Sequence, residues 1–224
     1  EPAGVRLAGL IFTQTNVATV VAGNYIDNCF IEWGNEHDPQ PEYSSEFSFG
    51  GLNVIGNIFI ASEVSPAFRW IVVKPYGAGH FFNGFSLMNN TFRVFNATVD
   101  RVEKVDTSFA DLDFTRSRNV RVEGNTFNQI AQTILNPIVA SHTQNSAASA
   151  WTVDASDYIP FGGRIRMVES VQPEGPLQNG SNQTRYLAPY AEPGQGAGGG
   201  QVTLRWGEAV KGKAIVSMRM DVPF

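Results

Sequence analysis

The chain has 224 residues, 42% of them apolar and 16 of them phenylalanine, which is enough for one large or two small domains with a sizeable core. Its net charge of −5 and its 16 scattered basic residues argue against a partner with a phosphate backbone, so no nucleic acid is expected. The single Cys29 excludes an internal disulfide and a cysteine zinc site, and no run reaches the roughly 18 apolar residues of a membrane helix.

The first predicted strand covers residues 5–12, where apolar side chains alternate with other residues. It begins close to the chain terminus, with no charged-then-apolar leader in front of it. We therefore expect the chain to be a fragment of a longer repetitive protein. A structured N-terminus is the alternative.

A six-residue pattern then recurs four times, at 21–26, 54–59, 87–92 and 122–127. It consists of an aliphatic residue, any residue, Gly or Asn, Asn, any residue, and Ile or Phe. Spacings of 33, 33 and 35 residues separate its asparagines, which are Asn24, Asn57, Asn90 and Asn125. Two residues before each aliphatic position, the apolar face is extended by Thr19, Leu52, Phe85 and Val120.

This pattern is typical of a strand, a sharp corner and a second strand. Gly or Asn tolerates the left-handed backbone that a tight corner requires. The Asn that follows can bond to local backbone or to its counterpart one coil away, because neighbouring strands lie roughly 4.8 Å apart. Further strand-like runs at 68–73 and 107–114 bring each turn to about three strands. We predict an all-β fold in which residues 1–140 form a solenoid of parallel strands. A β-sandwich with equally spaced strands is the alternative.

The composition changes after the repeat. Residues 141–150 are mostly small or polar and are predicted to be a connection. Residues 151–224 contain alternating runs at 163–169, 200–206 and 213–220, which predict a small antiparallel β-sandwich of about five or six strands. This domain is expected to cap the solenoid, because an open end would present unpaired strand edges.

Two segments hold the candidate carbohydrate-binding residues. An acidic segment at 27–38 contains Glu32 and Trp33, whose carboxylate and ring suit contact with a sugar. An aromatic-rich segment between coils contributes Trp70, Tyr76 and His80. The alternatives are a solvated acidic loop in the first segment and aromatic side chains that cover the solenoid edge in the second.

A third group of charged residues lies at 100–118, where acidic and basic side chains alternate. Such alternation favours ion pairs across strands or between subunits. Asp111, Asp113 and Arg116 also suit the metal ligands and the proton-abstracting base of a polysaccharide lyase, but their spacing is not specific. The sequence therefore assigns no catalytic residues, and neither a metal site nor a cofactor is expected.

The repeat resembles the right-handed parallel β-helix of the pectate-lyase-like superfamily. The residues that carry this resemblance are Gly23-Asn24-Tyr25-Ile26, Gly56-Asn57-Ile58-Phe59, Asn89-Asn90-Thr91-Phe92 and Gly124-Asn125-Thr126-Phe127. The resemblance covers about residues 5–135. It implies a right-handed parallel β-helix and no particular activity.

The C-terminal part is similar to the end module of spike proteins from phages and from gene transfer agents of alphaproteobacteria. The similar stretches are 151–164, 190–196 and 202–206. This resemblance implies a homotrimeric, tailspike-like head spike that recognises capsular or other surface polysaccharide of a host. It also implies an extracellular location as part of a virion or phage-like particle, with a secreted protein as the alternative.

The expected function is therefore that of a receptor-binding spike or fibre, joined to the remainder of the particle through a segment before residue 1. The main alternative is a polysaccharide-degrading enzyme on the same fold, either a lyase or a glycoside hydrolase. A purely structural fibre segment is a third reading.

Overall fold

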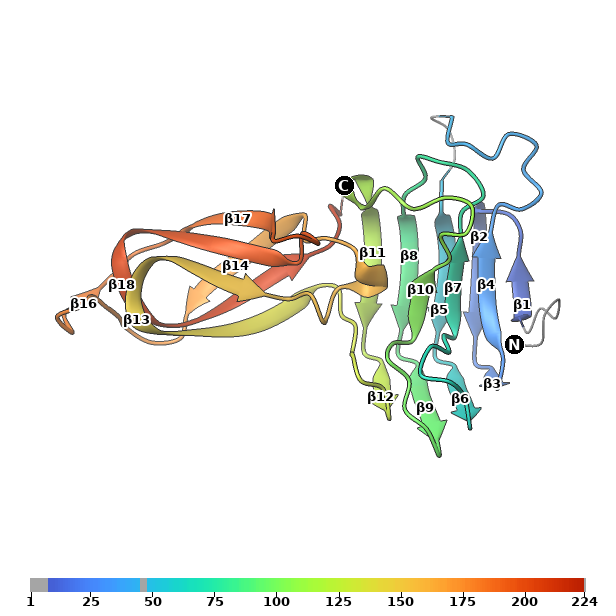
Figure 1. Ribbon diagram of the computed structural model, residues 1–224, viewed down its shortest axis with the longest axis horizontal. Coiled ribbons are helices and arrows are strands. Elements are labelled where there is room, and N and C mark those ends of the chain that lie inside the picture. Colours follow the sequence, from blue (N-terminus) through green and yellow to red (C-terminus); the bar gives the residue numbers. More distant parts are fainter. Residues whose placement is uncertain (1–7, 45–47, 224) are drawn as a thin grey trace. The chain divides into compact units, whose positions relative to one another are not determined.

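Strands dominate the computed structural model, which describes residues 8–44 and 48–223. They account for nearly all of the regular structure in these ranges, which confirms the expected all-β fold. The chain forms two units, one extending to Ile134 and the other covering Leu135–Val222 (Figure 1). The first three residues of the strand expected at 5–12 lie outside the described residues.

The first unit winds through three parallel sheets in a fixed order (Figure 1). Sheet I contains β1 (Ala8–Phe12), β4 (Phe30–Gly34), β7 (Ile71–Lys74) and β10 (Glu103–Val105). Sheet II contains β2 (Asn16–Ala22), β5 (Gly50–Ile55), β8 (Asn83–Met88) and β11 (Arg118–Glu123). Sheet III contains β3 (Tyr25–Asp27), β6 (Ile58–Ser62), β9 (Thr91–Phe95) and β12 (Thr126–Asn128). Each strand pairs in parallel with the strand one coil away, which confirms the predicted β-solenoid.

The register of these sheets follows the sequence repeat. Leu52, Phe85 and Val120 are paired neighbours in sheet II, and all three side chains are buried. In sheet III the rings of Phe59 and Phe92 stack with centroids 4.7 Å apart and an angle of 8° between their planes. Phe127 continues the stack at 5.7 Å and 7° from Phe92. Equivalent positions of successive coils therefore form columns in the interior, as the spacing of the repeat predicts.

The corner between sheets II and III has the left-handed backbone that was predicted. Gly23, Gly56 and Gly124 have φ values of 67°, 66° and 69°, and Asn89 takes the same position in the third coil with φ of 54°. A Cβ atom at Gly124 would lie 2.2 Å from Asn89 Oδ1. A side chain at position 124 would therefore displace the Asn89 side chain, and glycine leaves room for it.

The asparagines of the repeat form a hydrogen-bonded ladder beside this corner. The backbone N–H and the side-chain amide of Asn57 both donate to Asn90 Oδ1, at 2.9 and 3.0 Å. Asn57 Nδ2 also donates to the carbonyl oxygen of Val21 at 2.8 Å. The same relation joins Asn24 to Asn57 and Asn90 to Asn125. Because these groups lie at or near the core, each rung satisfies backbone groups that water does not reach.

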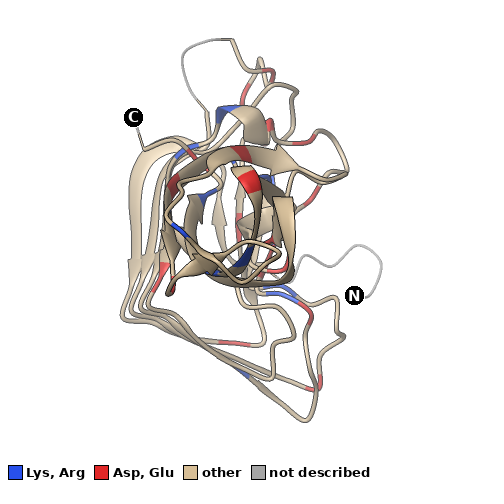
Figure 2. Cartoon of the chain, turned by 90° about the vertical axis from the view of Figure 1, so that its left-hand side faces the viewer, with Lys and Arg blue, Asp and Glu red and all other residues tan. Residues whose placement is uncertain are grey.

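The second unit is one antiparallel sheet of six strands. Its strands are β13 (Ile138–Asp154), β14 (Met167–Pro173), β15 (Leu177–Gln178), β16 (Thr184–Arg185), β17 (Tyr190–Gln195) and β18 (Gln201–Arg219). The long strand β18 pairs with β13, β14, β15 and β17, and the strands curve around a shared interior (Figure 2). The predicted antiparallel strands of the C-terminal part are therefore confirmed, and they form one sheet. Acidic and basic residues are scattered over it rather than gathered in one patch (Figure 2).

Residues 141–150, expected to be a connection, lie inside strand β13. Ser141 pairs with Ile215, and Ala150 pairs with Arg205. The side chains of this stretch are exposed or half-buried, so selection for apolar residues is weak there and the composition is that of a loop. The boundary between the units lies earlier, after Ile134.

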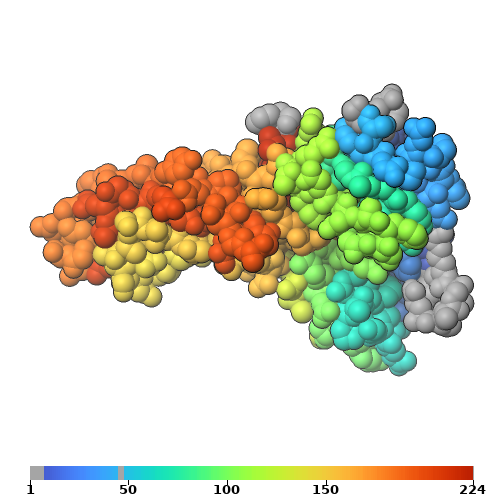
Figure 3. All heavy atoms as spheres, turned by 45° about the horizontal axis from the view of Figure 1, so that its top comes forward, coloured from blue at the N-terminus to red at the C-terminus, as the bar shows by residue number. Residues whose placement is uncertain are grey.

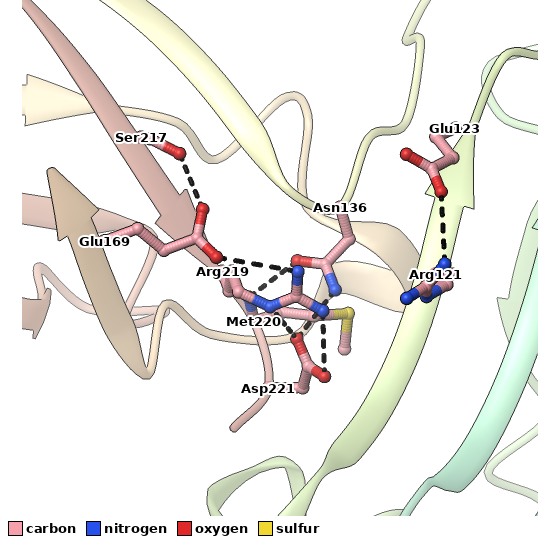
Figure 4. A network of polar contacts seen from close by, with 8 residues as sticks. All are labelled: Arg121, Glu123, Asn136, Glu169, Ser217, Arg219, Met220 and Asp221. Carbon is pink, nitrogen blue, oxygen red and sulfur yellow. Dashed lines mark hydrogen bonds and ion pairs between the residues drawn. The ribbon is translucent and has the colours of Figure 1, made fainter. Parts of the chain in front are cut away.

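A buried polar network joins the beginning and the end of the second unit (Figure 4). Asn136 Nδ2 donates to Asp221 Oδ1 at 2.8 Å, and Asn136 Oδ1 accepts from the backbone N–H of Met220 at 2.9 Å. Arg219 Nε donates to the same Asp221 oxygen at 2.9 Å. Arg219 also forms an ion pair with Glu169 of β14, at 3.7 Å. The network therefore holds β14, β18 and the segment before β13 together.

Helix is limited, in the described ranges, to two short 3-10 turns: η1 (Phe114–Arg116) in the first unit and η2 (Pro160–Gly162) in the second. No helix of the described residues has the length and the apolar character needed to cross a membrane.

Candidate functional site

The two tryptophans predicted to stack on sugars belong to the core of the solenoid. Trp33 is 2% exposed; its ring lies 5.1 Å from that of Phe49, and its Nε1 donates to the carbonyl oxygen of Gln14 at 3.3 Å. Trp70 is fully buried and packs 5.5 Å from Phe92. The prediction of sugar stacking is wrong for both, because neither ring is accessible. Sequence periodicity did not reveal this, since both residues lie beside loops.

Glu32 and His80 are buried as well, and the ring of His80 lies 5.5 Å from that of Phe49. Glu32 occupies the middle of β4, between Ile11 and Val72 of the adjacent strands. His80 anchors a loop: its Nε2 lies 2.7 Å from the carbonyl oxygen of Pro41. Its role in this structure is to position backbone, so contact with a sugar is not available to it or to Glu32.

Three loops between sheets I and II stack on one another and form a continuous surface. They comprise residues 35–44, 75–82 and 106–117. The backbone N–H of Tyr43 donates to the carbonyl oxygen of Ala78 at 3.0 Å, and that of Asp113 donates to His80 O at 2.6 Å. Figure 3 shows these loops meeting on one face of the solenoid, in blue, teal and yellow-green.

Asn35 and Gly77 determine how closely the first two of these loops approach each other. Asn35 donates to the carbonyl oxygen of Pro41 at 2.9 Å and accepts from the backbone N–H of Tyr76 at 2.8 Å. Gly77 lies so close to the first loop that a Cβ atom there would be 2.1 Å from Pro41 O. The position of Tyr76, the remaining predicted site residue, is therefore set by backbone contacts.

Tyr76 forms an aromatic pair on this surface. Its ring stacks on that of Phe109 with centroids 4.6 Å apart and 20° between the planes. Phe109 is 61% exposed, which is unusual for a phenylalanine. Lys74 Nζ lies 5.6 and 5.4 Å from the two ring centroids. A stacked, partly exposed aromatic pair with a cation at its edge is suited to ligands that have both apolar and polar faces.

Two arginines cover a second pair of rings. The guanidinium carbon of Arg116 lies 4.5 Å from the ring centroid of Tyr43 and 4.2 Å from that of Phe81. The guanidinium carbon of Arg118 lies 5.7 Å from the centroid of Phe81. We call the set Tyr43, Lys74, Tyr76, Phe109, Arg116 and Arg118 the loop surface.

The charge of Lys74 is held in place by Asp106, whose carboxylate lies 3.7 Å from Nζ. Burial raises the pKa of the Asp106 carboxyl, but hydrogen bonds from Ser108 and the charges of Lys74 and Lys104 outweigh it. The pKa of Asp106 therefore lies below its ordinary value. Asp106 stays ionised over the neutral pH range and keeps Lys74 beside the aromatic pair.

The three residues that suit a polysaccharide lyase by sequence, Asp111, Asp113 and Arg116, do not form a metal site. Asp113 caps η1 by accepting from the backbone N–H of Thr115 at 2.9 Å, and Asp111 accepts from Leu112 N at 2.7 Å. The described residues contain no group of three or more His, Cys, Asp or Glu side chains that could hold a metal ion. The run 107–114, expected to be a strand, is a loop followed by η1. Its carboxylates bond to nearby backbone and thereby stabilise turns.

The residues that form the loop surface have only a weak signal in the sequence. Tyr43 and Phe109 are single aromatics among polar and small residues, and neither belongs to an alternating run. Arg116 and Arg118 stand out only as part of a charged segment. Their relation to Phe81 depends on loop stacking between coils, which no local pattern encodes.

The second unit presents a different set of exposed aromatics. Tyr158, Tyr186 and Tyr190 are exposed, and Tyr186 adjoins an open depression of about 560 Å³ that also contacts Pro176 and Arg185. Trp151 and Trp206 are buried against each other, with ring centroids 4.7 Å apart. Arg185 is already paired with Glu208 at 2.8 Å, so this depression offers fewer free polar groups than the loop surface.

Comparison with known proteins assigns no family to the chain. No protein-family model matches it, and neither the curated proteins nor the solved structures contain a match. The candidate site is therefore judged on its own geometry.

Proposed function

We propose that the protein is the receptor-binding part of a spike or fibre of a phage-like particle, and that its loop surface binds surface or capsular polysaccharide of a host cell. The observation that carries the proposal is the partly exposed Tyr76–Phe109 pair on the flank of a solenoid, in which Phe109 is exposed and Tyr76 half-buried. Flat aromatic faces pack against the apolar face of a sugar ring, and stacked coils provide the extended surface that a polymer needs. The resemblance of the C-terminal stretches to spike end modules supports the same function.

The proposal includes a homotrimer located outside the cell, joined to the rest of the particle. Apolar side chains on the outer faces of sheets II and III support contacts between subunits. Val20 is 67% exposed and Tyr25 66% exposed, and Ile58 is also exposed. Neighbouring solenoids that share one axis would cover these side chains and protect strand edges.

The test is to incubate the purified chain with capsular polysaccharides from a panel of candidate hosts. Light scattering gives the mass of the protein particle, and size-exclusion chromatography follows the length of the polymer over time. We expect a particle of three chains that binds one polymer without shortening it. Shortened polymer would contradict the binding-only function and favour a lyase or glycoside hydrolase.

A pair of variants connects binding to the proposed surface. Phe109→Ala removes the exposed ring of the pair, and we expect binding to weaken at least tenfold. Phe95→Ala is the matched control, because Phe95 is also exposed but lies in strand β9 of sheet III. Equal loss in both variants would mean that polysaccharide does not bind at the loop surface.

A further inference from the structure

We propose that the loop surface selects carboxylate-bearing polysaccharides, such as those that contain uronic acids, and that Arg116 and Arg118 provide this selectivity. This inference rests on the proposed function, which it makes more specific. It is carried by two guanidinium groups on one phenylalanine ring, neither of which has a carboxylate partner among the described residues.

The first step is the position of the two cations. The guanidinium carbons of Arg116 and Arg118 lie 4.2 and 5.7 Å from the ring centroid of Phe81. Ser117 between them is fully buried, and the backbone N–H of Arg118 donates to Phe82 O at 2.8 Å. The backbone is thus fixed while both side chains extend from the same short segment. Two cations therefore lie near one aromatic ring and extend from the same three-residue segment.

The second step is how the surrounding groups hold them. Arg116 stacks on Tyr43 and Phe81, and its Nη1 is 3.4 Å from the carbonyl oxygen of Gly79. Aromatic faces and a carbonyl attract a guanidinium without neutralising it. These contacts fix the plane of the group and leave its other N–H groups for a ligand. A guanidinium fixed in this way loses little conformational freedom on binding.

The third step is that two carboxylates of the loop 106–117 have other partners. Asp106 is paired with Lys74, and Asp113 accepts from both the N–H and the hydroxyl of Thr115. Within the described ranges, no ion pair joins either arginine to an acidic side chain, whereas at least one ion pair is formed by each of Arg69, Arg101, Arg121, Arg185, Arg205 and Arg219. The planar fork of arginine matches a carboxylate in a two-point hydrogen bond. A sugar carboxylate therefore supplies the missing anion.

The experiment compares each capsular polysaccharide of the panel with its carboxyl-reduced form, in which uronic acids have become neutral sugars. The wild-type chain is expected to bind the native polymer at least tenfold more tightly than the reduced one. The double variant Arg116→Gln/Arg118→Gln is expected to lose this difference. Raised salt should weaken binding of the native polymer and leave that of the reduced polymer unchanged.

Three further variants keep the result interpretable. Arg116→Lys retains the charge and removes the planar fork, so we expect an intermediate loss, and Arg118→Gln changes an exposed residue with little effect on folding. Arg93→Gln is the matched control, because Arg93 also stacks on a ring, Phe95, at 4.4 Å, but lies in strand β9. Circular dichroism checks the fold of every variant.

The outcomes separate the inference from the proposed function. A bound polymer without carboxylates, or equal binding of native and reduced polymer, would overturn the selectivity and leave polysaccharide binding intact. If no polymer of the panel binds, the proposed function fails and the inference fails with it. If the Arg93→Gln variant loses as much binding as the double variant, binding depends on the total positive charge of the chain and not on Arg116 and Arg118.

Discussion

The two units differ in how their strands pair. In the solenoid, every strand is short and pairs only with its counterparts one coil away, so the same few contacts recur in columns. In the second unit, the single strand β18 pairs with four others and spans nearly the whole unit. The solenoid therefore distributes its stability over repeated positions, whereas the second unit concentrates it in one strand and in the polar network around Asn136 and Asp221.

Each unit is consequently sensitive in a different place. A change at a column position of the solenoid affects the coil on either side, because each ring or amide contacts two equivalents. A change in the second unit acts through β18, and its effect depends on which partner strand is lost. Three substitutions and one titration examine this contrast, beginning with the largest expected effect.

The aromatic column gives the strongest test. Phe92→Ala removes a fully buried ring that contacts Phe59, Phe127 and Trp70. We expect a loss of about 4 kcal/mol in the free energy of unfolding, measured by chemical denaturation, because a cavity remains between two stacked rings. Phe95→Ala, at the exposed end of the same strand, should cost less than about 1 kcal/mol. Equal losses would show that the column is not a special source of stability.

The asparagine ladder is next. Asn90→Ala leaves the backbone N–H of Asn57 and the carbonyl oxygen of Val54 without their present partners in the interior. We expect a loss of about 3 kcal/mol, with reduced hydrogen-exchange protection in the coils on both sides. Asn24→Ala removes the end of the ladder, where the side chain is exposed, and should cost less than half as much. Loss confined to one neighbouring coil would contradict coupling along the ladder.

The polar network of the second unit follows. Asn136→Ala removes the acceptor of Met220 N–H and the donor to Asp221, so we expect a loss of about 2 kcal/mol. Hydrogen exchange should show faster opening of β13, β14 and β18 while the solenoid amides keep their protection. Equal loss of protection in the solenoid would mean that the two units unfold together.

The smallest expected effect is a pH dependence in the second unit. Hydrogen bonds from the hydroxyl and the N–H of Ser156, and from Gln201, hold the pKa of the Asp154 carboxyl below its ordinary value of 3.8. A lowered pKa in the folded state contributes stability above that ordinary value, and this contribution is lost as the pH falls through the lower folded value. An NMR titration should show the Ser156 amide signal shifting below pH 3.8. Asp154→Ala should abolish the shift, and a midpoint above 3.8 would contradict the assignment.

The sequence was most informative where structure is repetitive. Asn24, Asn57, Asn90 and Asn125 predicted the period, the left-handed corners and the ladder, because each coil imposes the same constraint on the same residue type. It was misleading at 141–150, where a long paired strand with accessible side chains has the composition of a loop. Strands pair through hydrogen bonds of the backbone. The side-chain types of an exposed strand therefore give little indication that it is paired.

The candidate site was less predictable than the fold. Trp33, Trp70 and His80 are attractive ligand-binding residues by type, yet all three are buried. Phe109 became a candidate only once the fold had brought three separate loops into contact, and Arg116, which suits a lyase base by sequence, lies against the rings of Tyr43 and Phe81. Loop residues are free of the periodicity that reveals burial, so their accessibility depends on tertiary contacts.

The corner at Asn89 restricts the residue one coil further along. Because Asn89 Oδ1 occupies the space where a side chain at position 124 would begin, a second asparagine there would force the Asn89 side chain to move. A gene duplication that copied residues 83–117 in tandem would place an asparagine directly above another at this corner. The coils of the repeat look alike in sequence, but they are not interchangeable at this corner, where the coil with asparagine is followed by one with glycine.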